Sequence, residues 1–309
     1  MKVLNKISAQ RISWVKSNKE ALESNPTAIS NLYYPESADE LVELIQKLTA
    51  EGETYDLIGH SSNTLFLPSY HVDHLICTSK MSSWHETDTE IVCEGGVNVA
   101  SLSTEMIKAG YVGFEGLNDL PGTIAGAVYG NSGCRHCSVN ALVTDVELFT
   151  NDGIKHLSKE DLKLAYRSSA LKRKEIEGTI LRVHLRKCKG DSNKLIEIAN
   201  KNHEHRKEFQ PSSANNLGTT FNGGQCPTIK CRFLKLLEKC IQIATCKRDS
   251  RISFPLMLKL IGNGAFAPYV YRWNRYMFLD ARAHELFPQY IEFVRTLYKD
   301  SRLEIEIRK

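Results

Sequence analysis

The sequence predicts an α+β protein with two domains. Its 309 residues are enough for about two domains. Up to about residue 188, stretches with helical periodicity alternate with short strand-like runs. After GDSN at residues 190–193 the pattern changes to longer helices. We therefore expect a first domain of residues 1–188 and a smaller second domain of residues 189–309.

The first domain is predicted to alternate helices and short strands. Ser37 and Glu40 form a capping box ahead of DELVELIQKLTAE, whose apolar residues recur at helical spacing. Short strands follow at YDLIG, DHLICT and EIVCEGG, and a second helix at VASLSTEMIKAG. LVTDVELFT and GIKHL flank Asn-Asp-Gly at residues 151–153, which predicts a hairpin. TILRVHLRK alternates apolar and polar residues, as expected of the strand that ends this domain.

The second domain is predicted to be mainly helical, beginning with KLIEIANKNHEHRKEF. Its final helix, HELFPQYIEFVRTLYKD, contains Pro288, which must distort the first turns or mark the true start of the helix. LEIEIR at residues 303–308 is predicted to be one closing strand, with Glu304 and Glu306 on the same face.

Composition is that of an ordinary soluble globular chain, with 42% hydrophobic and 25% charged residues. No apolar run approaches the roughly 20 residues needed to cross a bilayer, and MKVLNKISAQRISWVK lacks the apolar core of a secretory signal. We therefore expect a cytoplasmic protein with no membrane partner. The net charge of +4 is small and the basic residues are scattered, so no nucleic-acid partner is expected. Nothing in the sequence indicates an oligomeric state.

The nine cysteines are expected to be free thiols, because the cytosol keeps thiols reduced. Cys134 and Cys137 form the one CxxC. Further cysteines follow in sequence at Cys226, Cys231, Cys240 and Cys246. A structural zinc site needs four ligands at suitable spacing, and a single CxxC does not supply them. We predict no metal site.

A glycine-bearing loop lies in GLNDLPGTIAGAVYGN at residues 116–131. Pro121, Gly122 and Gly126 place small or φ-restricted residues in an otherwise apolar segment. Glycine costs conformational entropy wherever it is held fixed, so this pattern is expected where main-chain N–H groups approach a ligand, most often a phosphate.

A second loop fits the same purpose. YDLIGHSSNTLF at residues 55–66 is predicted to be a short buried strand that runs into Gly59 and then into Ser61, Ser62 and Asn63. Backbone amides and hydroxyl groups in such a loop can surround an anion.

The order and spacing of these loops and of three later motifs resemble those of the UDP-N-acetylenolpyruvoylglucosamine reductase family. The later motifs are AYRSSALK at residues 165–172, QPSSANNLGTTF at residues 210–221 and LEIEIR. The resemblance covers most of the chain and is strongest between residues 90 and 186. It implies a two-part FAD-binding domain of the PCMH/vanillyl-alcohol-oxidase type at residues 1–188, and a smaller α+β substrate domain at residues 189–309. It also implies reduction of an enolpyruvyl ether on a UDP-sugar by NADPH, in peptidoglycan precursor or related cell-surface glycan synthesis.

The resemblance implies that both loops hold FAD. The residues concerned are Gly59, His60, Ser61, Ser62, Asn63, Pro121, Gly122, Thr123, Gly126 and Ala127. One departure stands out: the family loop has three glycines before Ser-Asn, and here His60 and Ser61 occupy two of those positions.

His60 leaves more than one interpretation open. It is either tolerated at a loop position with negative φ, or it is tethered covalently to the flavin, because Gly-His-Ser also resembles the loop of berberine-bridge-type oxidases. The match at Asn63 and the later motifs favour the reductase alignment. The alternatives to the reductase are an FAD-dependent sugar or alcohol oxidase and a non-catalytic flavin or nucleotide-sugar binding paralogue.

The reductase chemistry needs a fixed cation, because hydride transfer to the methylene carbon leaves negative charge spread into the substrate carboxylate. The resemblance assigns this role to Arg167, with Tyr166 beside it as a substrate-binding residue, and assigns a general-acid role to Glu306. Taken without the resemblance, Arg167 is equally a salt-bridge residue at the rim of the sheet, and Glu306 a residue of an edge strand.

A hydroxyl group must then deliver a proton to the carbanion. Thr219 stands where the family has the serine that supplies it, and Thr220 is the less favoured donor. Both threonines also suit a turn. Asn222 is expected to bind substrate. It begins Asn222-Gly223-Gly224, which replaces the polar or basic residue and proline usual in the family.

Overall fold

The structure is a computed structural model, and it describes residues 15–25, 27–134, 137–211, 213–247 and 249–309. These residues form two compact units. The first unit contains Ile29–His60 and His71–Gln210. The second contains the described residues before Ile29, together with Ser61–Tyr70 and Pro211–Lys309.

The first unit begins with a small parallel sheet in the order β1-β4-β2. Its strands are β1 (Ile29–Tyr33), β2 (Tyr55–Ile58) and β4 (Val72–Cys77). Helix α2 (Ala38–Ala50) buries Leu41 and Leu48 in the same cluster as Ile76 of β4. The predicted cap is present, because Ser37 Oγ accepts the Glu40 N–H at 3.2 Å. The Glu40 carboxylate accepts the N–H of Glu36 at 3.0 Å, one residue earlier than a standard capping box.

A five-stranded antiparallel sheet forms the centre of the first unit, in the order β10-β9-β11-β6-β5. Its strands are β5 (Trp84–Glu86), β6 (Glu90–Glu94), β9 (Val143–Thr150), β10 (Gly153–Ser158) and β11 (Thr179–Arg186). The hairpin predicted at residues 151–153 is confirmed, since Thr150 pairs with Gly153. Strand β11 buries Val183 and Leu185 in one core cluster and alternates them with polar residues, so this part of the sheet has one apolar and one polar face. Leu181 lies in the separate cluster around α2.

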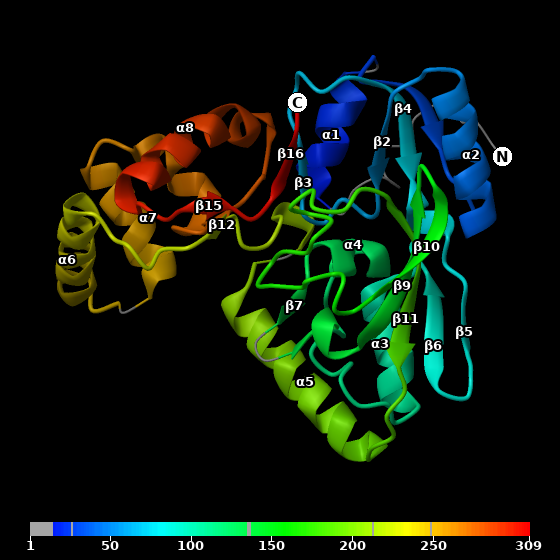
Figure 1. Ribbon diagram of the computed structural model, residues 1–309. Coiled ribbons are helices and arrows are strands. Elements are labelled where there is room, and N and C mark those ends of the chain that lie inside the picture. The colour runs from blue at the N-terminus through cyan, green and yellow to red at the C-terminus, as the bar shows by residue number, and fades with distance from the viewer. Residues whose placement is uncertain (1–14, 26, 135–136, 212, 248) are drawn as a thin grey trace. The chain divides into compact units, whose positions relative to one another are not determined.

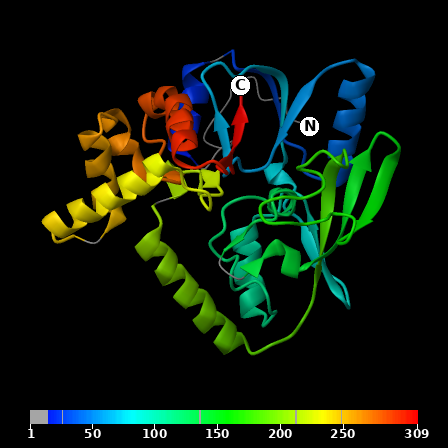
Figure 2. The same ribbon diagram turned by 60° about the vertical axis from the view of Figure 1, so that its left-hand side comes forward.

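Three helices cover the apolar face. They are α3 (Val99–Lys108), α4 (Ile124–Tyr129) and α5 (Ser192–Phe209). Helix α5 follows β11 after a short connection and packs against α3 (Figure 2). A small hairpin, β7 (Gly133–Cys134) and β8 (Cys137–Ser138), follows α4.

The second unit is mainly helical (Figure 1). Its core is rich in aromatic side chains. Its helices are α1 (Lys16–Ser24), α6 (Ile229–Ala244), α7 (Ser250–Leu260) and α8 (Ala281–Leu297). Its strands form the pairs β12 (Phe221–Asn222) with β15 (Arg302–Leu303), β13 (Val270–Arg272) with β14 (Arg275–Tyr276), and β3 (Thr64–Phe66) with β16 (Glu306–Arg308). The ring of Tyr276 lies 5.0 Å from that of Tyr290 and 5.1 Å from those of Phe278 and Phe287. Such tilted aromatic pairs stabilise a core beyond simple area burial.

The compact units do not follow the predicted boundary between residues 188 and 189. Helix α5 belongs to the first unit, because Leu195 and Ala199 are buried in that unit's core. Helix α1 and strand β3 belong to the second, because Asn18 Nδ2 donates to Thr64 O at 2.7 Å and β3 pairs with β16. The assignment of cofactor binding to residues 1–188 and substrate binding to residues 189–309 stays a prediction.

One local prediction in the second unit was wrong, and another was wrong in part. Helix α8 begins at Ala281, where Asp280 Oδ1 accepts the Ala283 N–H at 3.0 Å, so Pro288 lies inside the helix and does not mark its start. That Pro288 distorts the first turns stays a prediction. LEIEIR is not one strand: β15 pairs antiparallel with β12, and β16 pairs parallel with β3. The chain bends between them because Ile305, 4% exposed, turns into the core.

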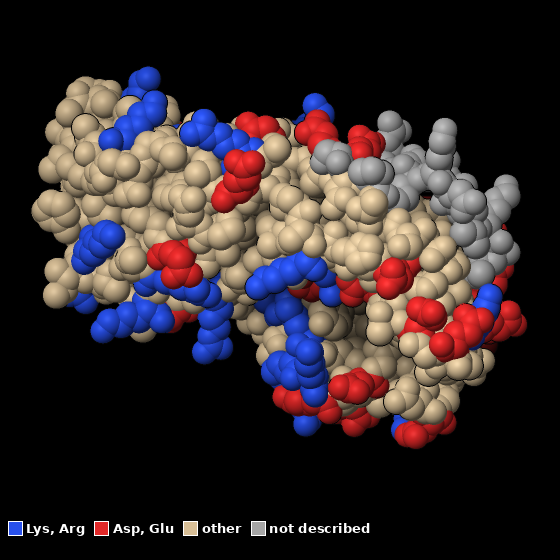
Figure 3. All heavy atoms as spheres, turned by 90° about the horizontal axis from the view of Figure 1, so that it is seen from above, with Lys and Arg blue, Asp and Glu red and all other residues tan. Residues whose placement is uncertain are grey.

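None of the described helices is long and apolar enough to cross a membrane. On the face drawn in Figure 3, basic side chains occur in several separate groups with acidic side chains between them. This distribution differs from the continuous basic stripe that duplex binding favours.

Candidate functional site

The two glycine-bearing loops meet in the first unit. Gly59 follows β2, and a Cβ atom at this position would lie 2.4 Å from Thr123 Oγ1. Only glycine allows the backbone to come this close. Thr123 caps α4 through its hydroxyl, which accepts the N–H of Gly126 at 3.3 Å, and Gly122 has φ of +127°. Ala127 anchors the loop in the core, whereas Gly126 is exposed and Pro121 is half-buried.

His60 is held by polar groups of the first unit. Its Nδ1 lies 3.4 Å from Asn98 Nδ2, and its ring hydrogen-bonds with the backbone of Gly122. Burial lowers the pKa of His60 despite the opposing effect of that backbone bond, so the ring is neutral at pH 7. Its φ is not positive, as expected for a residue tolerated in the loop.

Sequence reasoning missed Asn98. Its Oδ1 caps α3 by accepting the Ser101 N–H at 2.9 Å. An asparagine directly ahead of VASLST carried this signal, because asparagine is a preferred N-cap.

Ser61 has an unusual conformation and environment. Its φ is +50°, a region that favours glycine, and the residue is 6% exposed. Its buried Oγ has no hydrogen-bond partner among the described residues. Ser62 and Asn63 are half-buried in the same loop.

Asn63 connects this loop to the C-terminal segment. Its carbonyl accepts the Glu306 N–H at 2.8 Å, and its Nδ2 donates to Glu304 O at 3.2 Å. The Glu304 N–H in turn donates to Thr220 O at 2.9 Å. The segments that carry Asn63, Glu306 and Thr219 are therefore hydrogen-bonded neighbours within the second unit.

The two candidate threonines have different environments. Thr220 is 1% exposed, and its Oγ1 accepts the Tyr276 N–H at 3.1 Å, so it stabilises the core. Thr219 is half-buried, and no described residue hydrogen-bonds its hydroxyl. This difference favours Thr219 as the hydroxyl that faces a ligand.

Arg167 occupies a tight turn in the first unit. Ala165 and Ser168 pair across the turn, and Arg167 has φ of +53°. Its Nη2 donates to Gly133 O at 2.8 Å and its Nη1 to Asn131 O at 3.4 Å. These backbone acceptors orient the guanidinium without neutralising it. Tyr166, 70% exposed, presents its ring 5.4 Å from the guanidinium carbon.

The predicted catalytic and substrate-binding residues fall in both units. Arg167 and Tyr166 lie in the first, and Thr219, Asn222 and Glu306 lie in the second. That the two groups meet around a substrate stays a prediction.

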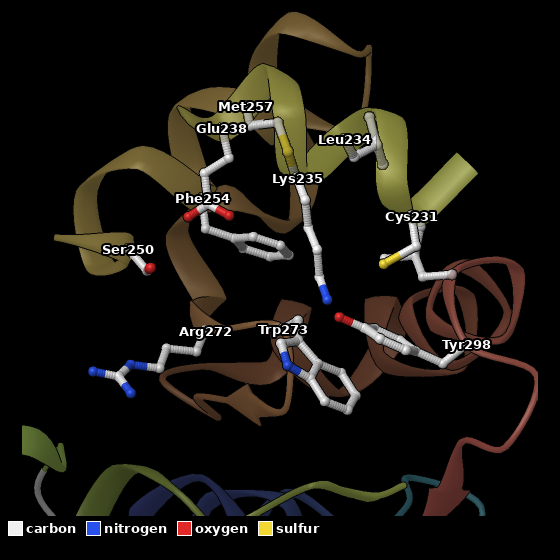
Figure 4. Close-up of a pocket in the computed structure, with 11 residues that line it drawn as sticks. Cys231, Leu234, Lys235, Glu238, Ser250, Phe254, Met257, Arg272, Trp273 and Tyr298 are labelled. Atoms are coloured by element: carbon white, nitrogen blue, oxygen red, sulfur yellow. The ribbon is translucent and has the colours of Figure 1, made fainter. Parts of the chain in front are cut away.

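The second unit also contains a pocket of about 270 Å³ that sequence reasoning missed. Lys235 and Tyr298 point into it from α6 and from the end of α8, and Trp273 lines its floor (Figure 4). The Trp273 and Tyr298 rings lie 4.3 Å apart, and Lys235 Nζ lies 5.4 Å from the Tyr298 ring. A Cβ on Gly224 would lie 2.7 Å from Trp273, so the Gly-Gly departure allows the backbone to approach this ring.

Comparisons with known proteins agree with the geometry. Residues 29–158 match the family model described as FAD binding domain. Similar proteins named UDP-N-acetylenolpyruvoylglucosamine reductase include that of Caldicellulosiruptor saccharolyticus, 27% identical over 62% of this chain and 62% of its own length. That of Anoxybacillus flavithermus is 32% identical over 43% and 44%, and that of Bacillus subtilis is 25% identical over 71% and 74%.

The chain is similar to these reductases over part of its length. It spans 62% and 44% of the length of the first two relatives. The crystal structure of UDP-N-acetylenolpyruvylglucosamine reductase (MurB) from Thermus caldophilus has the same fold, with a TM-score of 0.64 over 91% of this chain and 92% of that one at 20% identity. The α+β two-domain FAD-binding fold predicted from the sequence is confirmed.

The described residues fit FAD, the cofactor that the family model indicates. The match spans both glycine-bearing loops. The predicted pyrophosphate contact needs main-chain donors, and the glycines at positions 59 and 122 leave the backbone there without a side chain. The buried Ser61 hydroxyl is a donor that has no acceptor among the described residues.

We predict that Ser61→Gly stabilises the FAD-free protein and weakens FAD binding. The substitution relieves the strain of a left-handed backbone, about 1–2 kcal/mol, and removes a buried hydroxyl that has no partner among the described residues. Against these gains, glycine lowers the free energy of unfolding by about 0.5–1 kcal/mol, because it has more conformational entropy in the unfolded chain. Loss of a hydrogen bond worth about 0.5–1.5 kcal/mol should weaken FAD binding about 2- to 10-fold. Urea unfolding of FAD-free protein and fluorescence titration with FAD measure the two effects.

Ser61→Ala is the control, since it loses the hydroxyl but keeps the strain. Unchanged FAD affinity in both variants would contradict this role.

Proposed function

We propose that this protein is an NADPH-linked, FAD-dependent reductase that converts UDP-N-acetylenolpyruvoylglucosamine to UDP-N-acetylmuramate. It acts in the cytoplasm, in peptidoglycan precursor or related cell-surface glycan synthesis. Similarity to these reductases and the match to the FAD-binding model support the class of reaction.

One observation carries the proposal: three motifs far apart in sequence are hydrogen-bonded neighbours in the second unit. Asn63 comes from the cofactor loop, Thr219 from the segment assigned the proton donor, and Glu306 from the closing strand. Two backbone hydrogen bonds join the three segments: the Glu306 N–H donates to Asn63 O at 2.8 Å, and the Glu304 N–H donates to Thr220 O at 2.9 Å. An unrelated fold has no reason to unite these three positions.

In the proposed reaction, the loops at residues 59–63 and 121–127 would hold FAD, which would supply the hydride chemistry that links NADPH to the methylene carbon of the enol ether. The guanidinium of Arg167 pairs with the substrate carboxylate into which negative charge spreads. Glu306 acts beside that carboxylate as a general acid. The Thr219 hydroxyl delivers a proton to the neighbouring carbon, so that the double bond gains one hydride and one proton.

The pocket of the second unit suits the nucleotide of the substrate. The rings of Trp273 and Tyr298 offer a stacking surface for a base, and Lys235 and Arg272 offer positive charge for phosphates. The pocket adjoins Thr219 through the backbone, since Thr220 N donates at 2.7 Å to the carbonyl of Asn274, the residue after Trp273. Together with Asn222 on β12, these residues form the proposed substrate side.

The absorption spectrum of the purified protein tests this function. We expect a yellow protein whose flavin is bleached by NADPH without oxygen and is reoxidised by the enolpyruvyl substrate. Flavin that stays in the pellet after acid precipitation would instead favour the oxidase with FAD tethered at His60. Flavin that NADPH never bleaches would favour the non-catalytic binding protein. A folded, colourless protein that takes up no FAD would overturn all three.

We predict that Thr219→Ala leaves flavin reduction by NADPH intact and slows flavin reoxidation by substrate about 10²- to 10⁴-fold, the usual contribution of a positioned acid. Stopped-flow absorbance measures the two half-reactions separately. Thr219→Ser is the matched control and should retain activity, because it keeps the hydroxyl. Equal reoxidation rates in the parent and Thr219→Ala would remove Thr219 from the mechanism.

The same measurement applies to Arg167. Arg167→Ala should slow the second half-reaction about 10²- to 10³-fold, the cost of removing one electrostatic contact to the developing charge. Arg167→Lys keeps the charge but loses the planar guanidinium that Gly133 and Asn131 orient, so it should restore activity only in part. Full activity in Arg167→Ala would contradict the assignment.

We predict that Trp273→Leu weakens binding of UDP about 5- to 100-fold, since stacking of a base on an aromatic ring contributes about 1–3 kcal/mol. Isothermal titration with UDP measures the change. Phe233→Leu is the control, because Phe233 lies on α6 but is 64% exposed and outside the pocket. Unchanged UDP affinity in Trp273→Leu would contradict the assignment of the nucleotide to this pocket.

A further inference from the structure

Two histidines and an aspartate lie together on the polar face of the five-stranded sheet. Asp145 is on β9, and His156 and His184 are on the flanking strands β10 and β11. One ligand atom from each residue lies within 4.8 Å of the other two. The group belongs entirely to the first unit and includes none of the residues assigned to FAD or substrate.

The distances within the group are close to those of a metal site. Asp145 Oδ1 lies 3.6 Å from His156 Nδ1 and 3.8 Å from His184 Nε2. In a tetrahedral zinc site, bonds of about 2.0–2.1 Å place neighbouring ligand atoms about 3.3 Å apart. Small side-chain rotations therefore suffice. Glu147 Oε1, 3.5 Å from His184 Nε2, provides a further oxygen on the same side.

The environment of His184 is that of a metal ligand. Its Nδ1 lies 3.0 Å from Glu90 Oε2 and donates to it, and Glu90 Oε1 accepts the Thr144 hydroxyl at 2.9 Å. This bond leaves Nε2 with the ring's lone pair. His184 Nε2 is buried and has no hydrogen-bond partner among the described residues, yet it faces the carboxylates of Asp145 and Glu147. A lone pair directed at two carboxylates is unfavourable unless a proton or a metal cation lies between them, and carboxylate-histidine pairs of this kind commonly orient metal ligands.

An irregularity in the sheet creates this arrangement. His184 pairs with Asp145, and Leu185 pairs with Val143, so Thr144 is an extra residue in β9. The bulge places both Thr144 and Asp145 on the polar face, because an extra residue shifts the alternation of side chains. Arg182 donates to Glu147 Oε2 at 2.7 Å, so that carboxylate is already partly neutralised and is secondary to Asp145 as a ligand.

We propose that Asp145, His156 and His184 bind one divalent transition-metal ion, with Zn²⁺ the best match to two imidazole nitrogens and a carboxylate oxygen. The ion ties three adjacent strands together, and water completes its coordination because His156 is 65% exposed. Its role is structural and independent of the proposed reductase reaction.

Co²⁺ is the probe, since its spectrum distinguishes these ligands from the cysteines. Chelator-treated full-length protein is titrated with Co²⁺ and followed by absorbance. We expect one site with d–d bands and no thiolate-to-cobalt charge-transfer band, and displacement of Co²⁺ by Zn²⁺. His156→Gln and Asp145→Asn should each lower the affinity at least about tenfold, and Glu90→Gln about 10- to 100-fold, because outer-shell partners orient the ligands.

His71→Gln is the matched control, since His71 is also exposed and its Nε2 lies 3.6 Å from a carboxylate, that of Asp73. It should bind Co²⁺ as the parent does. His156 is exposed enough that its loss should not prevent folding, and circular dichroism checks this. Equal binding by the parent and His156→Gln, or bands from thiolate ligands alone, would overturn the proposal and leave the group as a protonated His184 held by carboxylates.

Discussion

The parallel pairing of β16 with β3 is the constraint on which the candidate substrate side depends. Only three residue pairs are involved, from Glu306 with Thr64 to Arg308 with Phe66, and so short a ladder is marginal alone. Buried Asn18 supports the other side of β3, donating to Thr64 O at 2.7 Å and accepting the Phe66 N–H at 3.4 Å. Leu65 and Phe66 are fully buried. The positions of Asn63 and Glu306 thus depend on a helix near the start of the chain.

Local sequence signals predicted the first unit well. The capping box at Ser37, the hairpin at residues 151–153 and the alternation of TILRVHLRK all depend on residues close together in sequence, and the structure contains each of them. The glycines at positions 59 and 122 were equally informative, because close backbone approach at Gly59 and the positive φ of Gly122 both disfavour other residues. The family resemblance, and not periodicity, supplied the roles of Arg167, Thr219 and Glu306.

Features that depend on distant residues escaped prediction. The pocket around Trp273 draws on α6, α7, the β13–β14 hairpin and α8, so no local motif marks it. His184 and Asp145 become neighbours only through strand pairing and a bulge. The sequence suggested only cysteines as metal ligands, because Cys134 and Cys137 form a local motif and the histidines and the aspartate do not. LEIEIR has the alternation of one strand, but burial of Ile305 divides it into two. Pro288 does not mark the start of its helix, because an aspartate cap at position 280 starts the helix earlier.

The path of the chain between the compact units has a practical consequence. Gly59 and His60 end one segment of the first unit, and Ser61 begins a segment of the second, so a single loop belongs to both. Cutting the chain after Gln210 would remove β16 and leave β3 without its partner. A contiguous fragment that spans the first unit, residues 29–210, also carries β3 without its partner, and a contiguous fragment that contains the whole second unit contains residues 29–210 as well. Dissection of this protein therefore calls for point substitutions in the intact polypeptide, or for a rearranged gene in which the crossing segments are rejoined, in place of simple truncation.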